Sequence, residues 1–417
     1  MAGENTVSTL NGLFKVVYAD KLLDLVPDYA ILQRLVDFVP ADKETGNYYA
    51  QPVNLAQEGG FTYNGENGGI ITLKQQRAGT MKEAQVKGSE LILRAQMSYK
   101  ALSQASTKGE KAFKRASAWK IEDMNNATRK RLEVAMLYGR FGIGTVNVAT
   151  DLTANSATLS ITAGTWAGGI WAGTEGHTLE GFNGTVKRTD GPLVISKVNS
   201  DLITLTVSYV GATLQTAAGD VLYFEGANSG ASAFLEMAGI AAIINNASVL
   251  FNIDASIYSL WKGNTVLTVG QISFGKIQDA VAKAVNKGLM SRCVVLLSPK
   301  AWGVLNSDQA ALRRYSASYK PSKFENGVEA LTFYAANGEL EIRSHPMVKD
   351  GDAFIIPIEE CMRIGSIDLT FGVPGMDQEF FVLVPGTNAV EIQCMTDQAF
   401  FIEKPAHAVL MQGITYA

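Results

Sequence analysis

The sequence predicts an α+β protein in which a small β-domain interrupts a mixed region of helices and strands. Residues 109–139 carry a long helical pattern, whereas residues 145–235 show only short Thr-, Val- and Ile-rich runs separated by Gly, Asn and Asp. Helical patterns return after residue 238 and alternate with short apolar runs. Because closely spaced strands without helices build a barrel or a sandwich, residues 145–235 are expected to form an inserted β-barrel or β-sandwich.

The N-terminal part divides into an arm and a long hairpin. Residues 1–46 predict an arm with a helical piece on either side of Pro27. Residues 47–98 predict a hairpin whose outgoing strand holds Tyr48 to Leu55 and whose returning strand holds residues 86–93. The stretch between them, from Gln57 to Gly69, is too glycine-rich and polar to form a core. Two interpretations stay open: the tip lies on a neighbouring subunit, or it is a disordered surface loop.

The long helix is the basic part of the chain. Phe113, Met124 and Ala135 recur every 11 residues, which is three turns of a helix, and Gly139 is expected to end it. Residues 82–140 contain 13 Lys and Arg against 6 Asp and Glu, whereas residues 145–235 contain 3 against 7. The exposed basic residues are therefore expected to face phosphate or acidic neighbouring surfaces, and the acidic β-domain to lie on the outer face of an assembly.

The remaining segments predict a second mixed region. Residues 269–287 form an amphipathic pattern, and Cys293 to Leu297 form a buried strand. An exposed loop is expected over residues 310–326. Further strands are expected at residues 340–343, 353–356, 380–384, 390–395 and 399–403. Trp166 and Trp171 are expected in the core of the β-domain or at a contact with a neighbour, because two exposed tryptophans would promote aggregation.

Composition favours a subunit of an assembly. Of the 417 residues, 18% are charged and 47% are hydrophobic, and the formal net charge is −4. A soluble domain usually has about 25% charged residues, and permanent subunit contacts reduce the need for them. The small net charge argues against a strongly basic nucleic-acid-wrapping protein. Three scattered cysteines, Cys293, Cys361 and Cys394, predict buried free thiols in a reducing compartment. With no signal peptide and no apolar spanning segment, the chain is expected to be made in a cytoplasm and to have no membrane partner.

A search for catalytic chemistry finds no constellation that requires an enzyme. Gly270 to Lys276 matches G-x-x-x-x-G-K, but Ile277 follows where a phosphate-binding loop needs Ser or Thr. The three histidines lie in different segments, and the acidic pairs are chain neighbours that point in different directions. The sequence therefore predicts no catalytic residue, no cofactor-binding residue, no cofactor and no metal ligand.

Several stretches resemble a known family. They are residues 81–87, 129–139, 296–302, 342–346 and 397–402. Together with the order of an arm, a projecting hairpin, a basic helix and a mixed region, they resemble major capsid proteins of tailed bacteriophages with the Hong Kong 97 fold. The likeness is greatest to capsid proteins of short-tailed phages of the N-four type.

The resemblance implies a division into parts. Residues 1–46 would be the N-terminal arm, 47–98 the extended loop, 99–144 the peripheral domain with the spine helix, 145–235 the insertion, 236–269 the return to the peripheral domain, 270–380 the axial domain, and 381–417 the C-terminal strands of the peripheral domain.

The resemblance also implies a function and partners. The chain would be a structural subunit that self-assembles through hexamers and pentamers into the icosahedral head around a double-stranded DNA genome. It would be made in the host bacterial cytoplasm and be part of the virion. A separate scaffolding protein, a portal, a possible decoration protein and non-specifically bound DNA would be its partners. The expected subunit-interface residues are Phe61, Tyr63, Lys74, Arg77, Arg129, Lys130 and Arg131.

Two alternatives remain at this point. One is an encapsulin-like compartment built on the same fold, although the inserted β-domain and the wide hairpin loop count against it. The other is a carbohydrate-binding or hydrolytic protein built on the β-segment. Particle size would separate a shell from an enzyme, and encapsidated DNA would separate a virus from a compartment.

Overall fold

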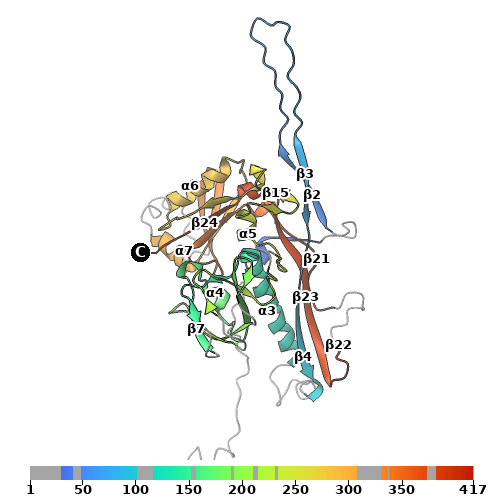
Figure 1. Cartoon of the computed structure of the whole chain (residues 1–417), viewed down its shortest axis with the longest axis vertical. Coiled ribbons are helices and arrows are strands. Elements are labelled where there is room, and N and C mark those ends of the chain that lie inside the picture. The colour runs from blue at the N-terminus through green and yellow to red at the C-terminus, as the bar shows by residue number, and fades with distance from the viewer. Residues whose placement is uncertain are drawn as a thin grey trace, which may run out of the picture.

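The computed structural model describes residues 30–40, 48–100, 116–151, 156–188, 192–209, 215–230, 233–307, 330–336, 338–372 and 382–416. The predicted helical pieces before residue 30, the first turns of the helix expected from residue 109 and the loop expected at residues 310–326 lie outside these residues. Within them, strands dominate and helices are few, which confirms the predicted α+β class. Figure 1 shows three sheets placed around one long helix, with a narrow hairpin projecting from the body.

The five-stranded sheet carries the long helix on one face. Its strands are β1 (Phe38–Pro40), β21 (Cys361–Thr370), β23 (Ala389–Ile402), β22 (Val382–Leu383) and β4 (Ser89–Ser98). Strand β4 alternates between half-buried and exposed residues, as a strand covered on one face must. Leu93 on β4 and Ile392 and Cys394 on β23 pack with Met124 of the helix, α3 (Ala116–Tyr138). The first half of α3 therefore lies across this sheet (Figure 1).

The second half of α3 is buried on all sides. Every residue from Leu132 to Gly139 is buried, and this stretch belongs to the largest core of the chain. The helix ends at Tyr138, directly before Gly139, the residue that the sequence predicts to end it. A side chain at Gly139 would overlap the main-chain oxygens of Met237 and Ala135. Glycine is therefore required for the close approach of the chain segment that leads into α5 (Ile240–Ile244).

The seven-stranded sheet is built from the β-rich segment. Its strands are β5 (Gly144–Thr145), β13 (Val221–Phe224), β8 (Thr178–Asn183), β10 (Leu193–Asn199), β11 (Thr204–Ser208) and β7 (Ser156–Ser160), with β9 (Val186–Lys187) paired to β8. A short pair, β6 (Thr150–Asp151) and β12 (Gln215–Thr216), lies beside it, and α4 (Gly168–Trp171) connects β7 to β8. Trp166 and Trp171 are buried and stack with ring centroids 5.8 Å apart, which confirms their expected place in a core.

The expectation that this segment has a core of its own is wrong. Its buried residues, among them Leu179 and Leu205, form one continuous cluster with Leu137 of α3 and Phe354 of a different sheet. Main-chain hydrogen bonds also join the two regions, from Asp350 N to Trp166 O (2.9 Å) and from Gly169 N to Pro346 O (3.0 Å). A sheet of this size with one apolar face must bury that face, and here the partners are α3 and the rest of the chain.

The six-stranded sheet has the order β16 (Asn264–Val266), β24 (Val409–Gln412), β20 (Asp352–Ile356), β17 (Cys293–Leu297), β19 (Gly338–Ser344) and β18 (Ala330–Ala335). Helices α6 (Phe274–Val285) and α7 (Pro299–Ser307) pack against it. The amphipathic pattern predicted α6 correctly: Ile277, Val281 and Ala284 are fully buried, and the Ser273 side chain caps its first turn. The buried strand predicted at residues 293–297 is confirmed as β17.

Several predicted strands have other bounds or other partners. The hairpin returns through β3 (Thr80–Val86), which pairs with β2 (Tyr49–Ala56), whereas residues 91–93 lie in β4 and pair with β23. The two strands expected at residues 390–395 and 399–403 are one strand, β23. Two short pieces, β14 (Val249–Leu250) and β15 (Ile253–Asp254), form a tight hairpin of their own.

Three strands also lie in a different sheet from the one that the domain division implies. β21, within the range expected for the axial domain, pairs with β23 in the five-stranded sheet. β16 and β24, from the ranges expected for the peripheral domain, pair with each other in the six-stranded sheet. For β24 the physical reason is burial: Val409 to Met411 are apolar and fully buried, so this strand needs cover on both faces.

Candidate assembly surfaces

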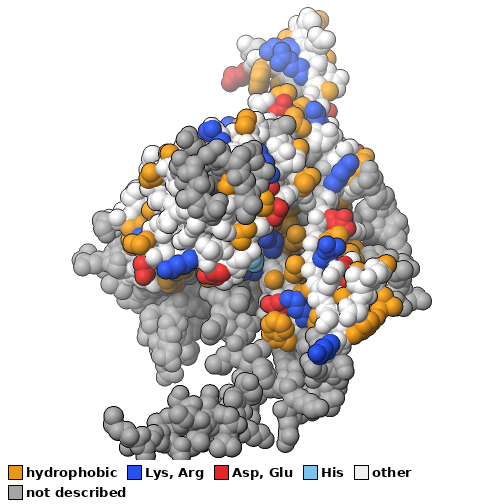
Figure 2. All heavy atoms as spheres, turned by 60° about the horizontal axis from the view of Figure 1, so that its bottom comes forward, with side chains coloured by type: hydrophobic (Ala, Val, Ile, Leu, Met, Phe, Trp, Pro, Cys, Tyr) orange, Lys and Arg blue, Asp and Glu red, His pale blue; other side chains and the backbone are white. Residues whose placement is uncertain are grey.

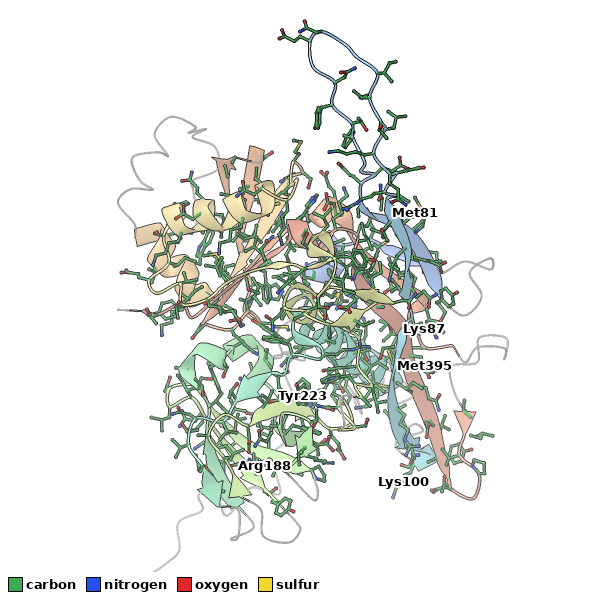
Figure 3. The ribbon with its side chains drawn as sticks, turned by 45° about the horizontal axis from the view of Figure 1, so that its top comes forward. Met81, Lys87, Lys100, Arg188, Tyr223 and Met395 are labelled. Carbon is green, nitrogen blue, oxygen red and sulfur yellow. The ribbon has the colours of Figure 1, made fainter. Side chains whose placement is uncertain are left out.

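The hairpin of β2 and β3 has a firmly packed root. Leu55 and Val86 are buried in a cluster with Trp261 and Phe401. The main-chain N–H of Gln85 donates a hydrogen bond to Phe251 O (3.0 Å) in the turn between β14 and β15. The Lys82 ammonium lies 5.2 Å from the centre of the Tyr258 ring. Figure 3 places Met81 at the point where the hairpin leaves this root.

The tip of the hairpin, residues 57–79, has no such packing. Figure 1 shows it extending well beyond the body of the molecule. Its internal hydrogen bonds are few. They include Gly59 N to Arg77 O (2.8 Å), Lys74 N to the Thr62 hydroxyl (2.9 Å) and Asn64 Nδ2 to Gly69 O (3.0 Å). The two halves of the tip are therefore held to each other at isolated points only.

Large apolar side chains are exposed along this tip. The exposed fractions are 72% for Phe61, 86% for Tyr63 and 77% for Leu73, and Ile70 is fully exposed. Lys74 and Arg77 are exposed on the same segment. Monomeric proteins rarely keep contiguous apolar groups in water, so this surface is suited to a contact with another molecule. The structure thus brings together Phe61, Tyr63, Lys74 and Arg77, four of the residues predicted for a subunit interface.

The other three predicted interface residues have different surroundings. Arg129 is half-buried, and its carbonyl accepts a hydrogen bond from Gln33 Nε2 (2.7 Å). The Lys130 ammonium donates to Ala172 O, and burial lowers the pKa of Lys130 to about 8. The Arg131 guanidinium lies over the Phe224 ring, 3.2 Å from its centre, and burial lowers its pKa to about 10. These three side chains do not form the exposed basic cluster that the sequence suggested, and their role at an interface stays a prediction.

Residues 30–40, with the short helix α1 (Leu32–Leu35), are anchored by a buried carboxylate. The Glu133 side chain of α3 is fully buried and accepts hydrogen bonds from Leu32 N (2.5 Å) and Gln33 N (3.3 Å). His345 Nε2 lies 2.9 Å from Glu133 Oε1, and His345 Nδ1 accepts from Met347 N (3.1 Å). Because Nδ1 is an acceptor, the ring proton is on Nε2 and donates to Glu133.

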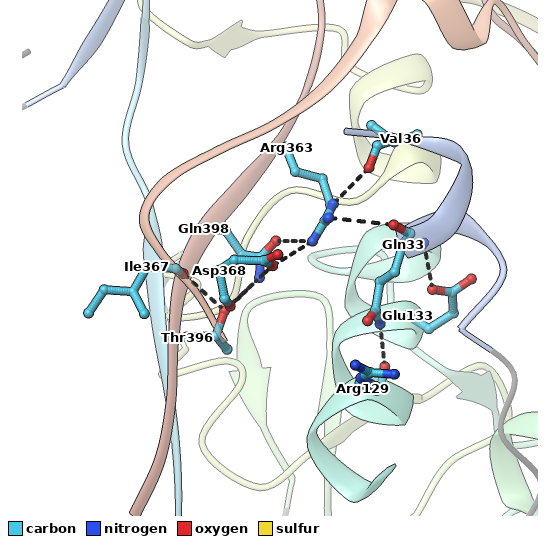
Figure 4. Close-up of polar contacts among 9 residues, drawn as sticks. All are labelled: Gln33, Val36, Arg129, Glu133, Arg363, Ile367, Asp368, Thr396 and Gln398. Carbon is cyan, nitrogen blue, oxygen red and sulfur yellow. Dashed lines mark hydrogen bonds and ion pairs between the residues drawn. The ribbon is translucent and has the colours of Figure 1, made fainter. Parts of the chain in front are cut away.

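A buried arginine holds the same segment from the five-stranded sheet. The Arg363 guanidinium donates to Val36 O (3.0 Å) and Gln33 O (3.5 Å) and also binds Asp368 (2.7 Å) and Gln398 (3.2 Å). Figure 4 shows Arg363 and Glu133 on opposite sides of residues 33–36. This anchor was not predicted from the sequence, although a lone Glu inside the apolar run Leu132 to Leu137 was a usable signal.

The phosphate-loop match of residues 270–276 has a local structural role. The Lys276 ammonium donates to Val269 O and to Gln271 O (2.8 Å), and so binds the main chain of the loop that precedes α6. The three cysteines are buried free thiols, as predicted. Burial, with smaller contributions from Glu360 and Glu359, raises the pKa of Cys293 to about 12. No group of three or more potential metal ligands occurs among the residues that the structure describes.

Charges on the described surface are mixed. Figure 2 shows Lys and Arg side chains interspersed with Asp, Glu and hydrophobic side chains over the visible face, without one large patch of either sign. None of the described helices is long and apolar enough to cross a membrane.

Comparison with known proteins gives a match at the level of structure. No protein-family model matches the sequence, and no curated protein does. The capsid of a native GTA particle superimposes with a TM-score of 0.53 at 9% identity, covering 99% of this chain and 100% of that chain. The capsid of cyanophage A-1(L) superimposes with a TM-score of 0.56 at 10% identity, covering 99% and 100%. This chain has the fold of phage capsid proteins.

Both matches span 99% of the chain. An encapsulin complex from Synechococcus elongatus aligns with a TM-score of 0.44 at 8% identity. At identities near a tenth, the capsid likeness establishes the fold. The function has to be argued from the surfaces described above.

Proposed function

We propose that this chain is the major capsid protein of a tailed bacteriophage. It self-assembles through hexamers and pentamers into the icosahedral head around double-stranded DNA and is not an enzyme. The observation that carries the proposal is the capsid fold over the full chain, combined with a hairpin whose apolar tip is exposed and whose root is rigid. A projecting apolar tip is costly for a monomer and useful for a subunit that covers it with a neighbour.

The Hong Kong 97 arrangement gives each part a role in this proposal. The hairpin of β2 and β3 is the extended loop, α3 is the spine helix, and the five-stranded sheet forms the peripheral domain with it. The six-stranded sheet with α6 and α7 is the axial domain, to which β16 and β24 belong as well. Kinship with short-tailed phages of the N-four type, a separate scaffolding protein, a portal and a possible decoration protein are parts of the same proposal. So is the location in the virion after synthesis in the host bacterial cytoplasm.

The hairpin tip offers the sharpest test of the function. In the triple variant Phe61→Ser, Tyr63→Ser and Leu73→Ser, we expect an unchanged melting temperature, since these side chains contact no core of their own chain. Assembly should be lost or greatly reduced, because the surface that covers a neighbour has become polar. Sedimentation of the expressed protein distinguishes assembled shells from free subunits, since a shell sediments in the megadalton range.

A matched control uses exposed apolar residues on another part of the chain. Val186 and Leu202 in the seven-stranded sheet region have exposed fractions of 64% and 69%, similar to those at the tip. The variant Val186→Ser with Leu202→Ser should assemble like the wild type. Equal assembly of the hairpin variant and this control would contradict the proposed role of the tip, and small oligomers in the wild type would contradict the shell itself.

We also propose that the seven-stranded sheet lies on the outer face of the shell. Its segment has an excess of four negative charges, which would be unfavourable next to packaged DNA. Limited proteolysis of intact particles should cut in residues 225–229, where Glu225, Gly226 and Ser229 are exposed. Cleavage near Gly142 is not expected, because residues 142–144 are buried. Protection of residues 225–229 in particles but not in free subunits would contradict the outward placement.

A further inference from the structure

A cavity of about 450 Å³ lies where β4, the middle of α3 and the seven-stranded sheet meet. Residues 89–93 of β4 form one wall, and residues 224–227 and 235–237 form another. Arg131 of α3 and His177, the residue before β8, complete the lining. The volume is within the range of small-molecule sites in proteins.

Two polar atoms in this lining are buried and unsatisfied. Arg131 is half-buried as a residue, but its Nη1 atom is buried and has no hydrogen-bond partner. The Nδ1 atom of His177 is also buried without a partner. Such atoms are rare in the described part of the chain, where only Trp171 and Tyr209 contribute others. A buried guanidinium nitrogen without an acceptor is unfavourable, so Arg131 Nη1 indicates a missing acceptor in this cavity, and His177 Nδ1 is a second nitrogen without a partner there.

Three glutamates line the cavity, of which Glu90 and Glu225 are exposed and Glu236 is half-buried, and none of them accepts from Arg131 Nη1. Glu236 lines the cavity, but its Oε1 accepts from Arg140 N (2.7 Å). Glu180, on the neighbouring strand β8, pairs with Lys187 (2.6 Å). The Arg131 guanidinium stacks on the Phe224 ring, which holds its plane fixed and leaves its edge for an acceptor. A planar fork fixed in this way suits carboxylate and phosphate oxygens.

We propose that this cavity binds an oxyanion, a carboxylate or a phosphate group, with Arg131 Nη1 as the principal donor and His177 Nδ1 as the second. The ligand class follows from the donors, because a guanidinium N–H and an imidazole N–H both require an acceptor. Burial and the nearby Arg131 and Lys130 charges lower the pKa of His177, which favours the neutral ring, and the tautomer with its proton on Nδ1 is the one that donates to the oxyanion.

The charged groups around the cavity give the binding a pH dependence. Glu90 comes from β4, Lys130 and Arg131 from α3, Arg140 from the turn after α3, Glu175 and His177 from the segment before β8, and Glu225 and Glu236 from the loop after β13. Burial raises the pKa of Glu236 to about 7. Below that pH Glu236 is neutral and no longer repels an anion. Binding of acetate, whose own charge does not change in this range, is therefore expected to tighten as the pH is lowered from about 8 to about 6.

Calorimetric titration of the purified full-length chain with inorganic phosphate, and separately with acetate, tests the proposal. The variant Arg131→Gln should weaken binding by roughly tenfold or more, the usual effect of losing a hydrogen bond to a charged group. The control Arg129→Gln removes a similar charge two residues away, and only the main-chain oxygen of Arg129 is used in the described contact with Gln33. It should bind like the wild type.

The titrations with phosphate and acetate can identify the ligand class or overturn the proposal. Stronger binding of phosphate than of acetate assigns the site to a phosphate-bearing ligand, and the reverse assigns it to a carboxylate. Equal weakening by both arginine variants, or binding of neither probe, overturns the proposal. Should Arg131→Gln not fold, an experimental structure of the wild type in saturating phosphate or acetate decides instead. Density for the anion at Arg131 Nη1 supports the site, and a cavity without it overturns the proposal.

Discussion

The buried carboxylate of Glu133 is expected to determine how firmly residues 30–40 are attached to the body of the subunit. Replacing it in Glu133→Ala removes the acceptor for Leu32 N, Gln33 N and the imidazole of His345. The Glu133 and His345 side chains and the Leu32 residue are fully buried, so water cannot replace the lost oxygen atoms without entering the core. The substitution also leaves a small cavity between α1 and α3.

The magnitude follows from the number of donors. Each buried donor that loses its partner costs about 1 to 3 kcal/mol, and three donors share the two carboxylate oxygens. Allowing for partial relaxation, we expect Glu133→Ala to lower the free energy of opening of residues 30–40 by about 3 kcal/mol. That corresponds to roughly a hundredfold faster opening-limited exchange of their main-chain amides. Glu133→Gln keeps an acceptor at Oε1 and should have an intermediate effect.

Hydrogen exchange followed by mass spectrometry measures this directly on a peptide that covers residues 30–40. Asp123→Ala in the same helix is the matched control, because Asp123 pairs only with Lys120 (3.0 Å) at the surface in the described contacts and should change exchange little. Unchanged exchange of the peptide in Glu133→Ala would refute the reasoning. An equal increase in Asp123→Ala would show that a general loosening of α3 is responsible.

Three further outcomes are expected. In Gly365→Ala the new methyl group would overlap the main-chain oxygen of Asp397 in the bulged pairing of β21 with β23. Thermal unfolding should therefore show a free energy of unfolding lower by about 2 kcal/mol or more. The control Gly303→Ala, whose new methyl group meets no atom within 4 Å, should be neutral or slightly stabilising. The pKa of Glu236 is raised from 4.5 to about 7, so the folded state binds the extra proton and wild-type stability should fall relative to Glu236→Gln as the pH rises through this window. The pKa of Lys349 is lowered from 10.5 to about 8, so the folded state binds fewer protons than the unfolded state between these values. The stability of the wild type should therefore rise relative to that of Lys349→Met as the pH increases from about 8 to 10.5. The same stability difference between the two proteins at every pH in that range would contradict this.

Local patterns predicted elements that carry an amphipathic repeat or a short, uniformly apolar run. Helix α6 and strand β17 were placed correctly, because an amphipathic repeat and a short apolar run specify burial without reference to distant residues. The strands of the β-rich segment were recognised for the same reason. The exposed apolar residues of the hairpin tip were found because glycine-rich sequence cannot form a core by itself.

Partners distant in the sequence could not be predicted in this way. Strand β4 was assigned to the hairpin, but its pairing with β23 joins Ser98 to Ala389 across most of the chain. The alternating pattern of β4 is equally compatible with either partner, since it specifies a covered face and not the strand beside it. The position of β24 between β16 and β20 could not be predicted for the same reason. The candidate oxyanion cavity depends on such distant pairings too, because its walls come from four separate segments.

The second half of α3 explains why the β-rich segment is not an independent module, although its sequence suggests one. Leu132 to Tyr138 are buried together with residues of the seven-stranded sheet, of α1 and of the six-stranded sheet. Tyr138 shows this most directly, since its ring packs edge-on against Phe354 (centroids 5.6 Å apart) and its hydroxyl accepts from Lys349 N (2.9 Å). Deleting residues 145–235 would expose this half of the helix, with its apolar surface, to water. The segment is therefore a structural part of the subunit that α3 requires, and a change at α3 is transmitted to all the regions that pack against it.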